Sequence, residues 1–378
     1  MKLKSWLLIF IVFLSCKDKY MPHIQYPPTG FLVAEGFINA GDSPTTILLT
    51  RASRLVSIQL IPETHALLDV QAENGASYPL TEDSGGKYTI THIAIDPGQR
   101  YRLHIKTSNG KEYLSDLADV KISPPIDTVA FVAGPEDVSI YVSTHDDQKK
   151  SQYYQWQFEE TWQYNAAYIS YYIYSPQTSP LPFIPRPNPG AYFNCWNMGL
   201  SSGILIASTI SLSSDLVYQF PVTKISYTAS NRLNLRYSIL VKQTVLSKEA
   251  YEWTQQLKKN TEQLGTIFDA QPSETGGNIH NISDPSERVI GFIGCSTQTE
   301  KRIFITRDEL PAVQVTNGYE TCLADTVLMT ANLYLYFGNG LFPLSYVKTM
   351  KGMAMAGASI TCVDCRTQGG TIVKPAFW

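Results

Sequence analysis

YRLHIKTSNGKEYL, residues 101–114, carries the clearest structural signal in this chain. Tyr101, Leu103 and Ile105 alternate with polar residues, which is the pattern of a strand with one buried face. Asn109-Gly110 then interrupts the alternation, and this dipeptide suits the positive backbone angles of a tight turn. The stretch therefore predicts a β-hairpin.

Further short strands precede this hairpin at regular spacing. Residues 31–38, 45–50 and 87–90 are rich in β-branched and aromatic residues and are separated by turn residues. Strands of this length and spacing predict a small immunoglobulin-like β-sandwich over residues 30–124. Pro124-Pro125 marks a domain boundary, because tandem prolines fit neither a helix nor a central strand.

The second part, residues 125–378, is predicted to be a larger β-sandwich-like domain with one packed helix and long loops. Residues 153–162 and 232–242 alternate strongly, and residues 302–306 and 331–337 are predicted as further strands. The helix is predicted over residues 247–264, since Ser247 is a good N-cap and Gly265 a natural terminator.

The composition also favours β-structure and excludes some functions. Of 378 residues, 44% are hydrophobic and only 17% charged, and tyrosine occurs 23 times. The net charge of -3 is spread over both signs, whereas a nucleic-acid binder needs a basic surface.

The amino terminus has the order of a secretory signal. Lys2 and Lys4 precede an apolar run over residues 6–14, and Ser15 then precedes Cys16. Nine apolar residues in a helix reach roughly 14 Å, which is too short to span a bilayer. We interpret residues 1–15 as a lipoprotein signal peptide and Cys16 as the site of lipid attachment. The alternative is an ordinary signal peptide cut elsewhere.

Residues 16–29 follow as a lipid anchor and flexible tether. This segment contains Pro22, Pro27 and Pro28 and lacks any apolar periodicity. Two or three acyl chains on one cysteine hold a protein stably at a membrane, so a membrane-anchored chain is expected.

Five cysteines remain after Cys16, and an exported chain is expected to form disulfides. Cys295 lies beside an apolar run and is our candidate for the free thiol. The other four, Cys195, Cys322, Cys362 and Cys365, would form two bridges, with three possible connectivities. Cys362 and Cys365 could instead form half of a zinc site, but no second cysteine or histidine pair completes it.

The segment from residue 164 to 190 is rich in tyrosine and proline. Long proline-rich loops within a domain are often functional, and exposed tyrosines suit binding surfaces. The candidate contact residues are Tyr164, Tyr168, Tyr171, Tyr172 and Tyr174. The alternative is an aromatic strand whose tyrosines pack in the core, followed by an inert loop.

No catalytic motif for a metalloprotease, P-loop enzyme, serine hydrolase or dinucleotide-binding enzyme is present. Arg102, His104 and Lys106 share the polar face of one strand, which we interpret as a solvated face; the alternative is a contact with an acidic partner or lipid phosphates. His145-Asp146-Asp147 fits an exposed turn better than a cation site. No cofactor and no metal are expected.

Two further sites each have a structural and a functional interpretation. Alternation places Glu160 between Phe158 and Trp162 on an apolar face, where an unpaired carboxylate is costly. It therefore needs a partner, such as an arginine or backbone amides, and we favour a structural pair over a catalytic acid. Gly276-Gly277-Asn278 is a turn rather than a phosphate-binding loop, because it follows no strand and lacks the lysine.

Several ordered motifs together resemble a known family. They include Leu32-Val33-Ala34-Glu35-Gly36, Arg236-Tyr237-Ser238-Ile239-Leu240-Val241, Gly277-Asn278-Ile279, Val289-Ile290-Gly291-Phe292 and Cys362-Val363-Asp364-Cys365-Arg366. The chain resembles, over nearly its whole mature length, the Bacteroidota outer-membrane lipoproteins of the uncharacterised domain-of-unknown-function 4249 family. The resemblance also implies that Cys195, Cys322, Cys362 and Cys365 form the bridges and that Cys295 is left over.

Such lipoproteins are often encoded beside TonB-dependent outer-membrane receptors. The resemblance therefore implies a non-catalytic binding or accessory subunit of such a receptor in nutrient uptake. The alternatives are a surface hydrolase acting on glycan or peptide, for which Glu160 is the one candidate acid, and a purely structural envelope protein.

Overall fold

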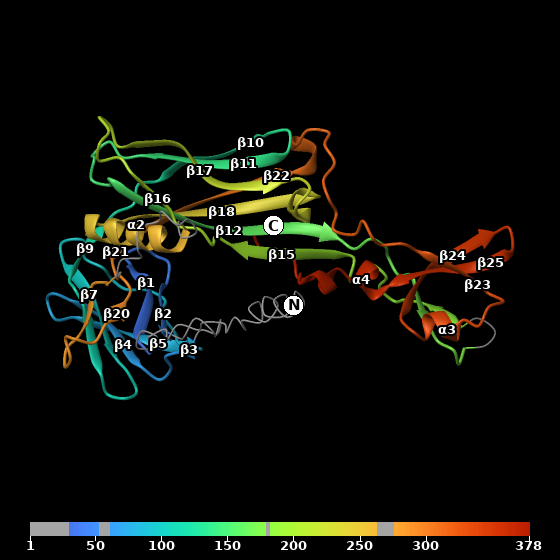
Figure 1. The fold of residues 1–378 in the computed structure, drawn as a ribbon, viewed down its shortest axis with the longest axis horizontal. Helices are drawn as coiled ribbons and strands as arrows, with labels where there is room; N and C mark the ends of the chain where they lie inside the picture. The colour runs from blue at the N-terminus through green and yellow to red at the C-terminus, as the bar shows by residue number, and fades with distance from the viewer. Residues whose placement is uncertain (1–29, 53–60, 179–181, 263–275) are drawn as a thin grey trace, which may run out of the picture.

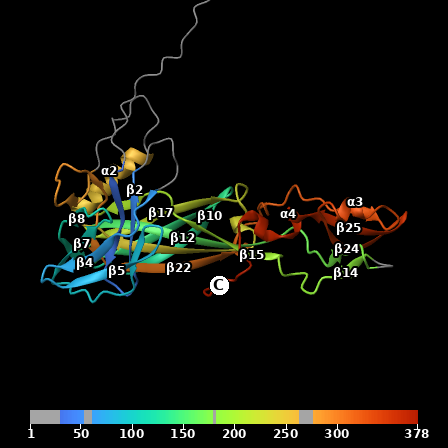
Figure 2. The same cartoon turned by 90° about the horizontal axis from the view of Figure 1, so that it is seen from below.

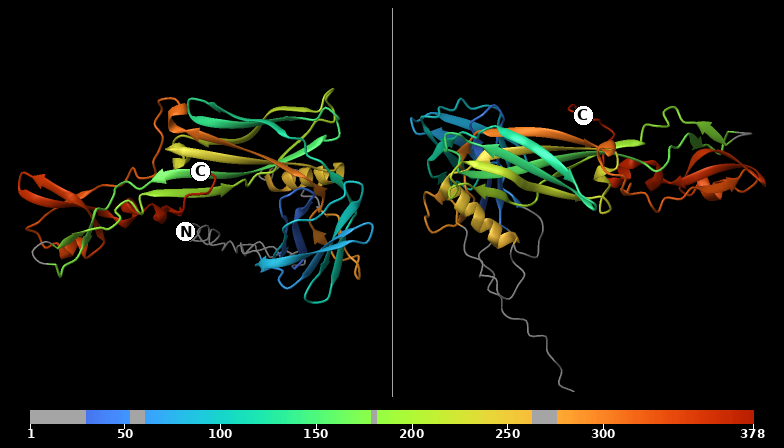
Figure 3. Two further views of the ribbon diagram at one scale, coloured as in Figure 1. Left: turned by 180° about the vertical axis from the view of Figure 1, so that it is seen from behind. Right: turned by 90° about the horizontal axis from the view of Figure 1, so that it is seen from above.

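The computed structural model describes residues 30–52, 61–178, 182–262 and 276–378, and these form mainly β-strands, as predicted. The molecule is elongated and has three parts (Figures 1 and 2). A barrel lies at one end, a two-sheet sandwich lies in the middle, and a smaller lobe lies at the far end. Figure 3 shows the same order from behind and from above.

The first part is a closed barrel of eight strands. The strands follow the order β7-β4-β5-β6-β2-β1-β21-β9, and β9 pairs with β7 to close the ring. They are β1 (Leu32–Asn39), β2 (Thr45–Arg51), β4 (Leu67–Ala72), β5 (Ser77–Ser84), β6 (Lys87–Ile90), β7 (Arg100–Lys106), β9 (Ala118–Lys121) and β21 (Cys295–Ser296). Four short strands extend it: β3 (Ile61–Pro62), β8 (Glu112–Ser115), β19 (Ile279–Asn281) and β20 (Val289–Ile290). The predicted hairpin is β7 and β8, with Gly110 at φ 85°.

This ring differs from the immunoglobulin-like sandwich that we predicted for residues 30–124. The physical reason is β21, which pairs in parallel with both β1 and β9 and joins two strand edges that would otherwise be open. The core of the barrel is formed by the inward residues of every strand, including Leu32, Val70 and Leu103, which are fully buried.

The second part packs two sheets face to face. One sheet has the order β10-β11-β17, and the other has the order β15-β12-β18-β22 with β16 paired to β12. The strands are β10 (Ile126–Ala133), β11 (Asp137–His145), β12 (Tyr153–Asn165), β15 (Asn194–Leu200), β16 (Leu205–Ser208), β17 (Leu216–Ser226), β18 (Arg236–Val245) and β22 (Gln298–Thr306). The short 3-10 helices η2 (Asn231–Leu233) and η3 (Arg307–Glu309) flank β18 and β22.

The alternating residues of β12 form the core of this sandwich. Trp156 is buried, stacks on Phe220 of the opposite sheet at 4.5 Å between ring centroids, and donates from Nε1 to Gln243 Oε1 at 2.9 Å. A buried indole needs such an acceptor, because an unpaired N–H would cost free energy. The same face carries Tyr154 and Trp162, so the alternation predicted for β12 is confirmed.

The far lobe is small. It contains the hairpin of β13 (Tyr172–Tyr174) and β14 (Phe183–Pro185) and the sheet of β23 (Asp325–Leu328), β25 (Gly352–Ser359) and β24 (Leu341–Thr349). The helical turns α3 (Tyr334–Phe337) and α4 (Ile360–Val363) complete it, and η4 (Cys365–Gln368) follows against β15 of the sandwich. Its aromatic core includes Phe183 and Phe337, whose rings meet edge to face at 5.0 Å.

Two predicted elements differ in outcome. Residues 331–337 were predicted as a strand, and this prediction is wrong, because they form a turn and α3. A short apolar run does not distinguish a strand from a helical turn.

The predicted helix is present as α2 (Lys248–Glu262), and Ala250 N donates to the Ser247 hydroxyl at 3.1 Å, as an N-cap requires. Within the described parts of the chain, no helix is both long and apolar enough to cross a membrane.

Candidate ligand-binding site

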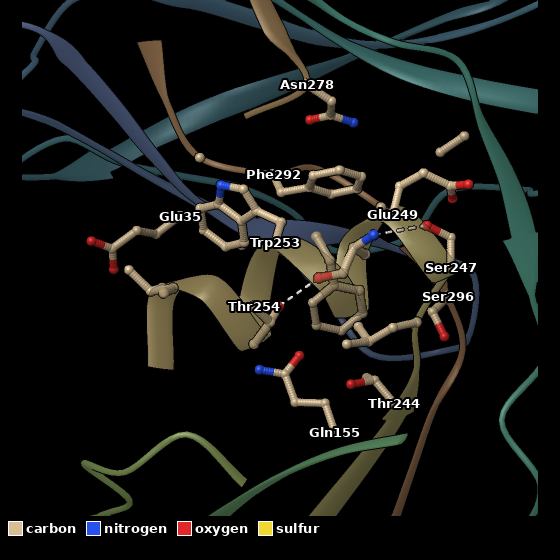
Figure 4. Close-up of a pocket in the computed structure, with 18 of the residues that line it drawn as sticks. Glu35, Gln155, Thr244, Ser247, Glu249, Trp253, Thr254, Asn278, Phe292 and Ser296 are labelled. Carbon is tan, nitrogen blue, oxygen red and sulfur yellow. Dashed lines mark hydrogen bonds between the residues drawn. The ribbon is translucent and has the colours of Figure 1, made fainter. Parts of the chain in front are cut away.

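A cavity of about 690 Å³ lies where the barrel meets the sandwich, against helix α2. Its walls come from β1 and β9 of the barrel, β12 and β18 of the sandwich, α2, and the segment of residues 290–296. The volume is within the range of sites that hold small molecules. Figure 4 shows the arrangement of the lining side chains.

Aromatic and aliphatic side chains form a large part of the cavity wall. Trp253 of α2 lies beside Phe292, with ring centroids 6.1 Å apart, and the indole N–H donates to the Gly276 carbonyl. Phe37, Leu246 and Leu257 continue the apolar surface. The indole is therefore fixed in orientation while its face stays available to a ligand.

Two neutral polar side chains face the helix from the sandwich. Figure 4 shows Gln155 of β12 and Thr244 of β18 pointing toward α2. They are adjacent, because β12 and β18 pair in register at these two positions. An amide and a hydroxyl offer both donors and acceptors, so they can orient a polar group of a ligand.

The charges around the cavity are mostly negative. Its lining carries four exposed carboxylates, Glu35, Asp116, Asp119 and Glu249, and one lysine, Lys121, which gives a formal charge of -4 + 1 = -3. A hydrogen bond from its own backbone amide, and then one from the Ser247 hydroxyl, lowers the pKa of Glu249. The mouth therefore disfavours anionic ligands.

The five cysteines after Cys16 form two disulfides and leave one free thiol. Cys195 bonds to Cys365, Cys322 bonds to Cys362, and Cys295 is free and buried, so the prediction of two disulfides is confirmed. Because Cys362 and Cys365 belong to different bridges, the zinc alternative is wrong. Burial raises the pKa of the Cys295 thiol to about 12, so it is unreactive at neutral pH. Cys16 lies outside the described residues.

Most of the candidate contact tyrosines serve the fold. Tyr164 is buried and donates to the Cys365 carbonyl at 2.7 Å, and Tyr168 donates to the Cys322 carbonyl at 3.1 Å. Tyr172 and Tyr174 pack into the core of the far lobe. Tyr171 alone among the five is exposed. Four of these residues thus fit the packing interpretation rather than a contact surface.

Glu160 has the arginine partner that its position demands. Both carboxylate oxygens accept from Arg232 Nη1 at 3.0 Å, and the Tyr237 hydroxyl donates to Oε2 at 2.8 Å. Burial raises the pKa of Tyr237, and the neighbouring carboxylate raises it further, so the phenol remains a donor. The guanidinium also lies over the Trp162 ring at 5.3 Å. Glu160 does not line the cavity.

We expect Arg232→Met to lower the free energy of unfolding by about 3 kcal/mol, because it leaves a buried carboxylate without its counter-charge. Adding Glu160→Gln should recover a large part of that loss. Lys242→Met is the matched control on the same sheet, since Lys242 pairs with the half-exposed Glu159 and should cost under about 1 kcal/mol. Urea denaturation measures all four proteins. An equal loss of unfolding free energy in Arg232→Met and Lys242→Met would contradict a structural role for the Glu160–Arg232 pair.

The other polar side chains that were considered as site residues pair with acidic residues close to them. His104 Nδ1 lies 2.7 Å from Asp69 Oδ1, and Lys106 pairs with Glu112 at 2.7 Å, so this strand face is a set of cross-strand pairs. His145 Nδ1 meets Asp127 at 2.8 Å, and that hydrogen bond raises the pKa of His145. Among the residues described, no group of three or more His, Cys, Asp or Glu side chains could hold a metal.

Gly276-Gly277-Asn278 holds the barrel together. A Cβ on Gly277 would lie 1.7 Å from the Gly291 carbonyl oxygen, so the two backbones pass in direct contact. The buried Asn278 amide donates to the Ile293 carbonyl at 2.9 Å and accepts from the Ile293 N–H at 2.8 Å. This turn fixes the segment that forms one wall of the cavity.

Sequence reasoning missed the residues of the cavity. Trp253 lies within the predicted helix, but neither it nor Gln155, Thr244 and Phe292 was singled out as a site residue. They come from β12, β18, α2 and the segment before β21, and nothing local in the sequence indicates that these elements converge.

Comparisons with known proteins give one family. The sequence model of a family described as "Domain of unknown function (DUF4249)" matches residues 17–302. No curated protein matches the chain. Among solved structures, the adhesin InvE of Yersinia pseudotuberculosis is 12% identical, with a TM-score of 0.14, over 57% of this chain and 54% of that chain. The chain thus spans about half the length of that protein, and so low a TM-score carries no argument.

Proposed function

Because the chain belongs to the DUF4249 family of unknown function, we propose from its own residues that it is a lipid-anchored, non-catalytic binding subunit at the outer membrane. The observation that carries this proposal is the cavity against α2, whose lining, among the described residues, combines aromatic side chains with neutral polar ones such as Gln155 and Thr244 and contains no histidine. Its negative mouth favours a ligand with an apolar body and a neutral or cationic polar group.

The leader supports the membrane location. The family match begins at residue 17, directly after Cys16, so the residues interpreted as signal peptide and lipid site lie outside the matched region. A lipid on Cys16 would hold the folded chain at the membrane surface. The resemblance to lipoproteins encoded beside TonB-dependent receptors supplies the proposed partner, which would receive the ligand for uptake.

The contacts of Glu160 weigh against the hydrolase alternative. A general acid must reach a substrate in a pocket, whereas Glu160 is buried against Arg232 and Tyr237 and lies outside the cavity lining. The structural-protein alternative draws support from the packed tyrosines of residues 164–174. A preformed cavity of this size, however, favours binding over a purely structural role.

Two measurements test the proposal. The lipid-anchored protein should co-purify with a receptor after mild detergent extraction of native membranes, and native mass spectrometry should detect a bound small molecule. Leu257→Arg, which places a charge in the cavity, should abolish the small-molecule signal, and Gln255→Arg on the exposed face of α2 should retain it. Recovery of only free, ligand-free monomer in several gentle detergents would contradict the proposal.

A further inference from the structure

The far lobe differs from the rest of the molecule in its charge. Residues 171–186 contain Arg186 and no carboxylate, and residues 326–359 contain Lys348 and Lys351 and no carboxylate. These 16 and 34 residues therefore carry a formal charge of +1 + 2 = +3. Since the whole chain carries -3, the remainder carries -6. Asp325, which begins β23, lowers the formal charge of the lobe to +3 - 1 = +2, so the lobe is positive in an otherwise acidic molecule.

The same lobe exposes large apolar side chains at its outer end. β24 and β25 pair up to Thr349 and Gly352, so Met350 and Lys351 form the turn of the hairpin. Met350 is 99% exposed and Met353 is 50% exposed. Soluble surfaces seldom gather such side chains without a contact to cover them.

Positive charge and exposed apolar side chains occur together at the β24–β25 turn. Lys348 pairs in register with Met353, so both lysines flank the exposed methionines at the hairpin turn. Asp325, the acidic residue that begins β23, pairs with Gly357 at the opposite end of the sheet. Figures 1 and 2 place this lobe at the end of the molecule farthest from the barrel. An exposed apolar tip flanked by lysines is the composition of a membrane-interface contact.

We propose that the β24–β25 turn forms a second membrane contact, which inserts its methionine side chains among the acyl chains of an anionic phospholipid surface. The lysines stay at the headgroup level and pair with lipid phosphates. The contact does not depend on the ligand cavity. It would hold the elongated molecule at two points, the lipid of Cys16 and this lobe.

A probe at the turn tests the contact. The full-length lipidated protein with Met350→Cys is labelled with a polarity-sensitive fluorophore, and Tyr218→Cys on the sandwich, 72% exposed, is the matched control. Cys295 does not interfere, because it is buried and its pKa is raised to about 12. Each protein is reconstituted into vesicles of phosphatidylethanolamine and phosphatidylglycerol with or without brominated acyl chains.

Bromine in the acyl chains should roughly halve the emission of the probe at position 350 and leave that at position 218 unchanged. Lys348→Glu with Lys351→Glu should remove the quenching, as should vesicles of phosphatidylcholine alone. Equal quenching at both positions would overturn the proposal. A blue shift in the emission of the probe at position 350 that appears only when membrane proteins are present, without quenching by bromine, would also overturn the proposal. The partner of the turn would then be a protein. Co-flotation of the chain with vesicles reports the Cys16 anchor separately.

Discussion

Replacing both Cys195 and Cys365 with serine is expected to lower the free energy of unfolding by about 5 kcal/mol. The bridge joins residues 170 positions apart, so its loss frees a long loop in the unfolded chain. It also ties β15 of the sandwich to η4, next to the start of the far lobe, where the Tyr164 hydroxyl donates to the Cys365 carbonyl. Urea denaturation without reductant, followed by tryptophan fluorescence, measures the loss.

The second bridge is the internal control. Cys322 and Cys362 are 40 positions apart and lie within the loop that the first bridge closes. Replacing this pair with serine is expected to cost about 4 kcal/mol and to loosen the far lobe first. A larger cost for this shorter loop would show that local packing, not chain entropy, dominates the effect of these bridges.

The strands that sequence reasoning located share one property, which is a strong local pattern. β12 alternates over most of its length, and β18 carries Tyr237, Ile239 and Val241 at alternate buried positions. Asn109-Gly110 indicates a turn through the backbone angles that it favours. The burial of Glu160 and its need for a partner followed from the same alternation. The identity of Arg232 did not, because the partner comes from a different segment of the fold.

The closure of the barrel could not be predicted in this way. β21 is two residues long, and its pairing with β1 and β9 is parallel, which requires a long connection rather than a turn. The cavity depends on the same closure, since the segment from Ile290 to Ser296 forms one of its walls. Neither the closed barrel nor the cavity could therefore be predicted, and the physical reason is the same. Pairing between segments far apart in the chain leaves no periodic pattern in the sequence.

Gly277→Ala is expected to lower the free energy of unfolding by more than about 4 kcal/mol and to open the barrel. The added Cβ would lie 1.7 Å from the Gly291 carbonyl oxygen, and Gly291 in turn touches the Ala34 carbonyl of β1. Backbone cannot move aside as a flexible side chain can, so the substitution should push the segment of residues 277–296 away from β1. The Asn278 clamp on Ile293 would break with it.

Gly276→Ala separates this steric effect from a general effect of losing glycine. A Cβ on Gly276 meets no atom of the described residues within 4 Å, so this neighbouring variant should stay within about 0.5 kcal/mol of the natural protein. Limited proteolysis should cut Gly277→Ala within residues 277–296 while Gly276→Ala stays resistant. Because that segment lines the cavity, the first variant should also lose the bound small molecule. If both variants proved equally stable and equally resistant to proteolysis, the segment of residues 277–296 would not be what closes the barrel. The proposed binding role of the cavity would then lose support, because this segment forms one of its walls.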